Sequence, residues 1–227
     1  GFLLAVALNQ KLRGSTVYRA LFFIPAILSP VVVGIVWQSI LDPFSGVLAQ
    51  FGRATGLTFL SGDYLSNPET AIFTVIFVNV WMWTGFSMLF YLAGLQLIDP
   101  SLTEAARVDG ANGFQQMTRI TFPLLKNTTL SLVLLGIIGS LKTFELVYVL
   151  TQGGPNHASE MLPTFAFQEA FQLQNVGYAS TISVVLLVIA VVSSLSMVRV
   201  FGAGFGFVLG CTSLFASALM TAGVGPW

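Results

Sequence analysis

Side chains that commonly carry catalysis are scarce in this chain. Its 227 residues include nine Lys or Arg, nine Asp or Glu, one histidine and one cysteine. His157 is interpreted as an ordinary solvated loop residue, since no nearby nucleophile suggests a Ser-His-Asp arrangement. The sequence has no HExxH or Cys/His metal spacing, and none of its lysines follows a glycine, as the lysine of a Walker A loop must. We therefore predict a chain that is not an enzyme and that binds no metal, cofactor or ATP itself.

Two ionisable side chains interrupt a long apolar run. Lys142 and Glu145 lie within residues 127–150, where buried charge is costly and commonly functional. If this run is one helix, the two residues are three positions apart and can form an ion pair. Two interpretations stay open: a mutually satisfied pair near the outer interface, or groups that face an internal pathway or a partner chain.

The elements that must position these groups are membrane helices. The chain is 55% hydrophobic and only 8% charged, whereas soluble domains carry about 25% charged residues. Residues 21–41, 70–98, 127–150 and 170–198 are each long enough to span a bilayer as a helix. Residues 1–8 are too short and are expected to be the tail of a helix whose beginning is missing. The runs do not alternate as β-barrel strands do, so the fold class is an all-α polytopic membrane protein.

The last 26 positions differ from the rest. Residues 202–227 carry no charge and are rich in glycine, so they form either a fifth span, a re-entrant piece or an atypical apolar tail. We therefore place one transmembrane domain at 1–201. Pro25 and Pro30 are expected to bend the 21–41 span, because each removes a helix hydrogen bond.

The distribution of Lys and Arg sets the orientation. Short cytoplasmic loops carry an excess of these residues. They concentrate in 9–19, in 99–126 and at Arg199, which we place inside. The loops 42–69 and 151–177 hold a single Arg between them and are placed outside.

The 99–126 loop has an ordered pattern of its own. Asp99-Pro100 fits a helix start, with proline at the first helical position. Ser101 and Glu104 also fit a capping box. A short helix is expected through Val108, followed by a turn at Gly110 that a β-carbon would resist.

A second helix is expected after that turn. Asn112 can cap it, with Gln115 three residues further on. Phe114, Met117 and Ile120 then share one apolar face, and Pro123 marks the bend into the next span. The alternative is an amphipathic helix that only lies on lipid headgroups at the membrane surface.

These residues carry a family resemblance. The loop reads Glu104-Ala105-Ala106-Arg107-Val108-Asp109-Gly110-Ala111 and later Ile120-Thr121-Phe122-Pro123. It resembles the EAA motif of ABC importer permeases, in which Gly, Ile and Pro follow the Glu at six, sixteen and nineteen positions. Segments 92–96, 144–155 and 177–180 are similar to the carbohydrate-uptake branch, the maltose and glycerol-phosphate permease type. Met117 departs from the pattern, which usually has Phe there.

The resemblance implies a type I importer permease with its N-terminal part missing. It implies a bacterial or archaeal inner-membrane, multi-pass subunit that forms half of a pathway with a second homologous permease. Two copies of a cytoplasmic ATPase would hold ATP and Mg, an extracytoplasmic solute-binding protein would deliver the solute, and lipid would surround the spans. No nucleic acid partner is expected from a chain of zero net charge.

The loop would dock on the ATPase. Glu104 offers a charge to a basic group, the alanines allow close approach and Phe114 offers an apolar anchor. The residues expected to couple to the ATPase are Glu104, Ala105, Ala106, Asp109, Gly110, Ala111, Phe114, Ile120 and Pro123.

A solute pathway is expected between the spans. Aromatic rings stack on sugar faces, although packing against lipid or helices is the commoner role of such rings. The candidate pathway residues are Asn79, Trp83, Ser87, Lys142, Phe144, Glu145 and Tyr148. The solute is a sugar or a phosphorylated polyol.

The alternative is a self-contained secondary transporter. Such a protein needs intramembrane carboxylates or inverted repeats. The spans offer only Glu145, and no repeat is visible. The sequence therefore favours a transport subunit that is powered by another chain.

Overall fold

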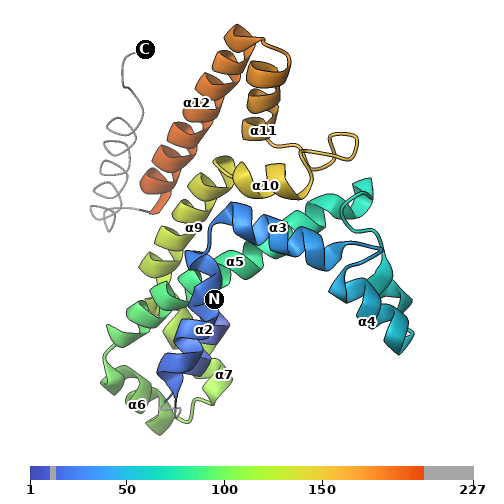
Figure 1. The fold of residues 1–227 in the computed structure, drawn as a ribbon. Helices are drawn as coiled ribbons and strands as arrows, with labels where there is room; N and C mark the ends of the chain where they lie inside the picture. The colour runs from blue at the N-terminus through green and yellow to red at the C-terminus, as the bar shows by residue number, and fades with distance from the viewer. Residues whose placement is uncertain (11–13, 202–227) are drawn as a thin grey trace.

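The computed structural model describes residues 1–10 and 14–201. Every regular element within these two stretches is a helix, which confirms the all-α prediction. The helices run from α1 to α12 in chain order, with the short helical turns η1, η2 and η3 between them (Figure 1). The predicted apolar tail 202–227 lies outside the described residues.

Two helices are long and apolar enough to cross a membrane individually. They are α5 (Pro68–Gln96) and the Val176–Met197 part of α12 (Val176–Phe201). Both match predicted spans. The short α1 (Phe2–Leu8) matches the predicted apolar start and packs against α5.

Two further pairs of helices reach this length and hydropathy only when taken together. They are α2 (Ser15–Ile27) with α3 (Pro30–Leu41), bent by 97°, and the segment Gly113–Leu124 with α9 (Lys126–Leu141), bent by 68°. The described residues therefore hold two membrane-capable helices, or up to four if each bent pair is one span.

The predicted span 21–41 is not one continuous helix, because α2 and α3 meet within it at the 97° bend. The chain leaves the helix at Leu28 and Ser29, whose ψ angles of 146° and 134° are extended, and Pro30 then opens α3. Proline disfavours helical backbone in the residue before it but suits the first helical position. Pro25 lies inside α2, so the large bend is located at the break before Pro30 and not at Pro25.

The predicted continuous helix 127–150 is also wrong. The helix α9 stops before Lys142, whose backbone N–H donates to the Gly139 carbonyl, and α10 (Glu145–Leu150) begins three residues later. Lys142 and Glu145 therefore sit on either side of a helix break. The one-helix spacing from which their ion pair was inferred does not exist.

The two predicted outside loops are partly helical. Each holds one α-helix and one short turn that the sequence patterns did not indicate. These are α4 (Val47–Thr55), the 3₁₀ turn η1 (Thr58–Ser61), α11 (Leu162–Phe167) and the π-helix η3 (Gln168–Gln172).

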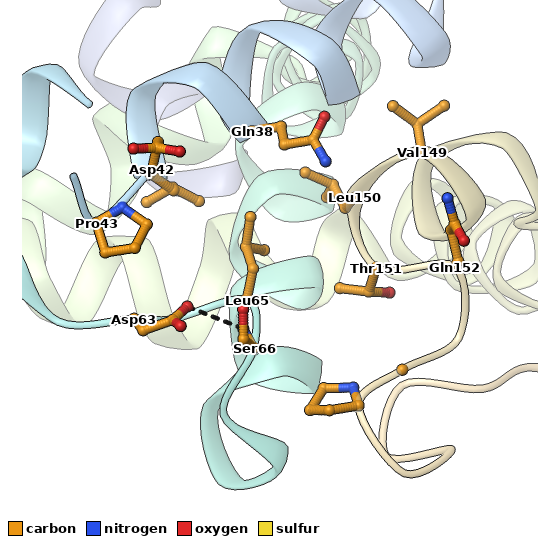
Figure 2. A pocket seen from close by; sticks show the side chains of 13 residues that line it. Gln38, Asp42, Pro43, Asp63, Leu65, Ser66, Val149, Leu150, Thr151 and Gln152 are labelled. Atoms are coloured by element: carbon orange, nitrogen blue, oxygen red, sulfur yellow. Dashed lines mark hydrogen bonds between the residues drawn. The ribbon is translucent and has the colours of Figure 1, made fainter. Parts of the chain in front are cut away.

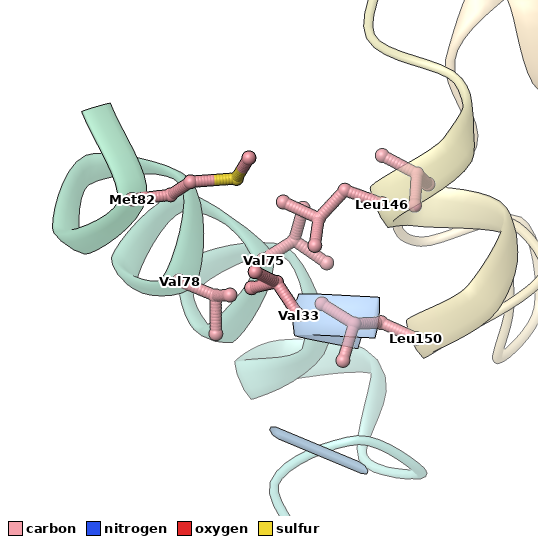
Figure 3. Close-up of a cluster of buried hydrophobic side chains, with 7 residues drawn as sticks. Val33, Val75, Val78, Met82, Leu146 and Leu150 are labelled. Atoms are coloured by element: carbon pink, nitrogen blue, oxygen red, sulfur yellow. The ribbon is translucent and has the colours of Figure 1, made fainter. Parts of the chain in front are cut away.

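The core is built around α5. Buried side chains of α3, α5 and α10 meet in one cluster (Figure 3), which comprises Val33, Val75, Val78, Met82, Leu146, Val147 and Leu150. A second cluster joins α1 to the C-terminal half of α5 and to Leu125. The long helix α5 thus ties both ends of the molecule together.

Glycine permits the closest helix contacts. A β-carbon at Gly85 of α5 would overlap the backbone carbonyl of Phe22 in α2. A β-carbon at Gly34 of α3 would lie 2.8 Å from a methyl group of Val149 in α10. Small residues at such contacts let helix backbones approach, as is common in membrane proteins.

The 99–126 segment lies at one end of the molecule. Its helices α6 (Pro100–Val108) and α7 (Gly113–Gln116) are close to the start of α2 (Figure 1). In the same view α10 and α11 lie above them and α4 lies to one side.

Candidate functional site: the 99–126 loop and the break between α9 and α10

The first helix of the loop is capped by Asp99. Its Oδ1 accepts a hydrogen bond of 2.9 Å from the Ser101 backbone N–H, and Pro100 occupies the first helical position. The predicted capping box of Ser101 and Glu104 is therefore wrong, because the cap lies two residues earlier. The Ser101 backbone N–H, helped by the Ser101 hydroxyl, holds the pKa of Asp99 below its usual value.

Gly110 closes the first helix as predicted. Its φ of +82° lies in the left-handed region. The Gly110 N–H donates to the Arg107 carbonyl at 3.1 Å, and the Ala111 N–H donates to the Ala106 carbonyl at 2.9 Å. These two bonds make a Schellman motif, which favours glycine at this position.

The second helix begins as the sequence predicted. The Asn112 side chain accepts from the Gln115 N–H at 2.8 Å, and the Gln115 side chain accepts from the Asn112 N–H at 3.0 Å. The chain continues through the π-helix η2 (Met117–Thr121) and α8 (Phe122–Leu124). The bend into α9 follows at the buried Leu125.

One side-chain bond ties the two arms of the loop. The Gln116 Nε2 donates to the Thr103 carbonyl of α6 at 2.7 Å. Together with the caps and the turn, this bond makes 99–126 a defined helical hairpin. A hairpin held in this way can transmit a displacement of its tip to α5 and α9.

The tip of the hairpin presents apolar side chains to solvent. Val108 is 89% exposed and Phe114 is 70% exposed, on opposite sides of the Gly110 turn. Among the other predicted coupling residues, Glu104, Ala105, Asp109 and Pro123 are exposed, Ala111 and Ile120 are half-buried, and Ala106 is buried. The tip can therefore bind a partner through both apolar and charged contacts.

Sequence reasoning did not single out Val108 and Leu97 as exposed apolar side chains. Leu97, at the end of α5, is 88% exposed. Val108 follows Glu104 by four residues, so helical spacing already placed the two side chains on one face. No comparable local signal marked Leu97, because it continues the apolar pattern of α5.

The predicted pathway residues fall into two groups. Asn79, Trp83 and Ser87 follow one another along α5, and the Trp83 ring packs edge-on against Phe86 at 5.9 Å. Asn79 and Ser87 are half-buried, and Trp83 is 46% exposed. This group lies on α5, whereas the other four residues lie at the break between α9 and α10 or within α10.

The second group gathers at the break between α9 and α10. The rings of Phe144 and Tyr148 stack at 5.3 Å with an interplanar angle of 23°. Phe167 of α11, which the sequence analysis did not single out, contacts both rings at 5.1 and 5.0 Å. Lys142 and Glu145 are exposed beside this aromatic cluster.

The outer loops add features without a sequence signal. His157 lies 75% exposed, as predicted, and its Nδ1 is 2.8 Å from Glu160 Oε2. A pocket of about 380 Å³ opens nearby, between the end of α3, residues 63–66 and the end of α10. Its residues come from three separate segments, so local patterns could not assemble it.

Comparisons with known proteins agree with this geometry. A family described as binding-protein-dependent transport system inner membrane component matches residues 1–205. The chain is 37% identical over 206 residues to the probable ABC transporter permease protein YurN of Bacillus subtilis, covering 90% of this chain and 70% of that protein. It is 31% identical over 199 residues to the multiple sugar-binding transport system permease protein MsmF of Streptococcus mutans, covering 88% of this chain and 68% of that protein.

The fold has a solved counterpart. A bacterial alginate ABC transporter, crystallised with an alginate pentasaccharide-bound periplasmic protein, matches with a TM-score of 0.77 and 27% identity. The match covers 86% of this chain and 68% of that chain. The chain thus spans about two thirds of the length of these proteins. The relatives are permeases, which are transport components rather than enzymes, and this confirms the prediction of a non-enzymatic subunit. The chain belongs to the family of inner membrane components of binding-protein-dependent transport systems.

Proposed function

We propose that this chain is the transmembrane permease subunit of an ATP-driven importer of sugars that depends on a solute-binding protein. The observation that carries the proposal is the 99–126 hairpin, whose exposed Val108 and Phe114 flank a fixed turn. Burial of these two side chains against a partner would stabilise docking, because removing apolar surface from water is favourable by about 25 cal/mol per Å². The family and its named permeases support the same conclusion.

The partner of the hairpin is a cytoplasmic ATPase. We infer two copies of it, which hold ATP and Mg, and a second homologous permease that completes the pathway. Val108 and Phe114 fill apolar recesses on the ATPase, and Glu104 meets a basic group. ATP can shift the pathway between its inward- and outward-facing states only if it binds them with different affinity.

The hairpin is suited to pass on this change. It continues directly from α5 through Asp99, and it joins α9 at Leu125. The Gln116 to Thr103 bond keeps its two arms in register. A movement of the ATPase therefore reaches two long helices of the core together.

The proposed topology places this hairpin in the cytoplasm of a bacterium or archaeon. The four complete spans within 1–201 are then α2 with α3, α5, α9 with α10, and α12. The Lys and Arg of 9–19 and 99–126, and Arg199, support this orientation. The outer ends of α3 and α10 then face an extracytoplasmic solute-binding protein.

The proposed solute is a sugar. MsmF is named for multiple sugar-binding transport, and the solved alginate transporter carries a polysaccharide. The stacked Phe144 and Tyr148 offer ring faces of the kind on which sugars pack. A self-contained secondary transporter is not favoured by these comparisons.

Co-purification tests the docking hairpin. We would express the chain together with the permease and the ATPase that neighbouring genes encode. The complex would then be purified through a tag on this chain alone. Val108→Asp, Glu104→Arg and Gly110→Trp should each lose the ATPase, because they place charge or bulk at the docking tip. Val47→Asp is the matched control, since Val47 is 69% exposed on the outer helix α4.

The co-purification result either supports or contradicts the docking role of the hairpin. Retention of the ATPase by wild type and by Val47→Asp, with loss in the three hairpin variants, supports the proposal. Wild type that inserts in the membrane but retains no ATPase contradicts it.

A further inference from the structure

The outer pocket is an open hollow with the size of a small-molecule site. Its volume of about 380 Å³ lies within the usual range for ligand pockets. Figure 2 shows side chains from α3, from residues 63–66 and from the end of α10 arranged around one hollow. Leu41, Leu65 and Leu150 supply apolar surface, while Gln38, Asp42, Asp63 and Gln152 supply polar groups.

Both carboxylates of the pocket are held in place. Asp42 Oδ1 accepts from the Ser45 N–H at 2.6 Å and from the Phe44 N–H at 2.9 Å, which lowers the pKa of Asp42. Asp63 Oδ1 accepts from the Ser66 N–H at 3.0 Å. In each case the bonds use Oδ1, so Oδ2 remains available to accept from a ligand hydroxyl.

Gln152 is positioned by an unusual backbone. Its φ of +54° lies in the left-handed region, which few residues other than glycine adopt. The Gln152 carbonyl accepts from Gln168 Nε2 at 3.0 Å, and its N–H donates to the Val147 and Tyr148 carbonyls. Such backbone persists where its surroundings fix it, and it is common at ligand sites. Figure 2 places the Gln152 side chain at the rim of the pocket.

The charge of the pocket selects among solutes. Of its thirteen lining residues, two are Asp and none is Lys or Arg. Fixed carboxylates accept hydrogen bonds from sugar hydroxyls but repel phosphate and carboxylate groups. The mixture of carboxylate, amide and apolar surface thus suits a ligand that has hydroxyls and C–H faces but no negative charge.

We propose that this outer pocket binds an uncharged sugar on its way into the pathway and excludes anionic solutes. The proposal rests on the proposed importer function. It narrows the solute from sugar or phosphorylated polyol to a neutral sugar. It also separates this chain from the solved importer of alginate, which is an acidic polysaccharide.

The experiment uses the full complex of both permeases, ATPase and solute-binding protein in proteoliposomes. A panel of neutral mono-, di- and oligosaccharides, glycerol 3-phosphate and an oligouronate is screened for stimulated ATP hydrolysis. The neutral sugar that stimulates best is then the probe for the variants. Saturation-transfer NMR measures whether the same sugar contacts the complex without the binding protein.

Three pocket variants and one control are compared. Gln152→Gly keeps the left-handed backbone but removes the amide, and Asp63→Asn removes one charge while keeping the Ser66 bond. Each should raise the KM for the neutral sugar by about three- to tenfold, as expected for one lost hydrogen bond, and weaken the NMR signal. Asp63→Lys should in addition allow the oligouronate to bind. Glu69→Gln, which removes an exposed outer carboxylate outside the pocket, should leave these quantities unchanged.

The failures are distinguishable. If a neutral sugar drives the wild-type complex but no pocket variant changes its KM or NMR signal, the pocket proposal is wrong and the importer stands. If an anionic solute is the best stimulant, the pocket proposal is wrong as well. If Asp63→Lys prevents association of the solute-binding protein but leaves the sugar contacts unchanged, the pocket proposal is wrong. The pocket then binds a cationic side chain of the solute-binding protein instead of a sugar. If no ATPase co-purifies with the wild type, the proposed function and the pocket proposal both fail.

Discussion

Single residues decide the shape of the docking hairpin. Gly110 adopts a φ of +82°, and no atom lies within 4 Å of where its β-carbon would be. Its importance is therefore conformational rather than steric. Asp99 acts in a similarly local way, since its carboxylate holds the first free N–H of α6.

We predict that Gly110→Ala loosens the hairpin. A side chain in left-handed backbone costs about 1–2 kcal/mol, so the Ala111 amide should exchange its hydrogen roughly tenfold faster by mass spectrometry. Gly113→Ala is the control, because Gly113 has open space and starts a helix, where alanine is favoured. Equal exchange in the two variants would argue against a conformational role of Gly110.

A second prediction concerns pH. Because the pKa of Asp99 is lowered in the folded hairpin, its contribution is complete above its ordinary value of 3.8 and is lost as the pH falls through the lowered value. Protection factors for the start of α6 should therefore stay constant from neutral pH down to about pH 5 and decline in stronger acid. In Asp99→Asn the acid-dependent part should vanish, and a decline that persists would assign it to another group.

Among the elements, α5 decides how the others pack. It contributes to both buried clusters and contacts α1, α2, α9 and α10. Its contact with α2 requires Gly85, where a β-carbon would collide with the Phe22 carbonyl. The obstacle is backbone, so a rotamer change cannot relieve it.

We expect Gly85→Val to separate α2 from α5. Overpacking a close contact costs about 1–3 kcal/mol or more, which should lower the melting temperature of the detergent-solubilised chain by several degrees. Gly136→Val on α9 is the control, because it makes the same glycine-to-valine change in a helix. No atom outside the helix's own backbone lies within 4 Å of the new β-carbon, so its melting temperature should stay near that of wild type. Similar melting of both variants would mean that the α2–α5 contact is dispensable.

For the whole molecule, the separation of its two ends is the property that function requires. The hairpin α6–α7 lies at one end (Figure 1), and the pocket is lined by the ends of α3 and α10 and by residues 63–66, which lie away from that hairpin. A docking tip and a solute entrance that lie apart fit a subunit that converts movement on one side of a membrane into access on the other.

Cysteine labelling checks this orientation. The chain has one cysteine, Cys211, so Cys211→Ser gives a background without thiols. In that background, Ala54→Cys on α4 should react with a membrane-impermeant maleimide in intact cells. Ala105→Cys on α6, expressed without the ATPase, should react only after permeabilisation. Both positions are exposed, and labelling in the reverse pattern would invert the proposed topology.

The sequence determined the features that depend on neighbouring residues. The apolar runs of α5 and α12, the Asn112 capping box, the Gly110 turn and the spacing from Glu104 to Pro123 all follow from local chemistry. The tertiary structure decided the rest. It ended α9 after Leu141, folded parts of the outer loops into helices, and brought α3, residues 63–66 and α10 around one pocket. Where no proline marks a break, as Pro30 does before α3, an apolar run does not encode it, because lipid-facing and core-facing residues look alike in a membrane protein. The packing of distant segments, through contacts such as Gly85 with Phe22, decides what the apolar runs leave open.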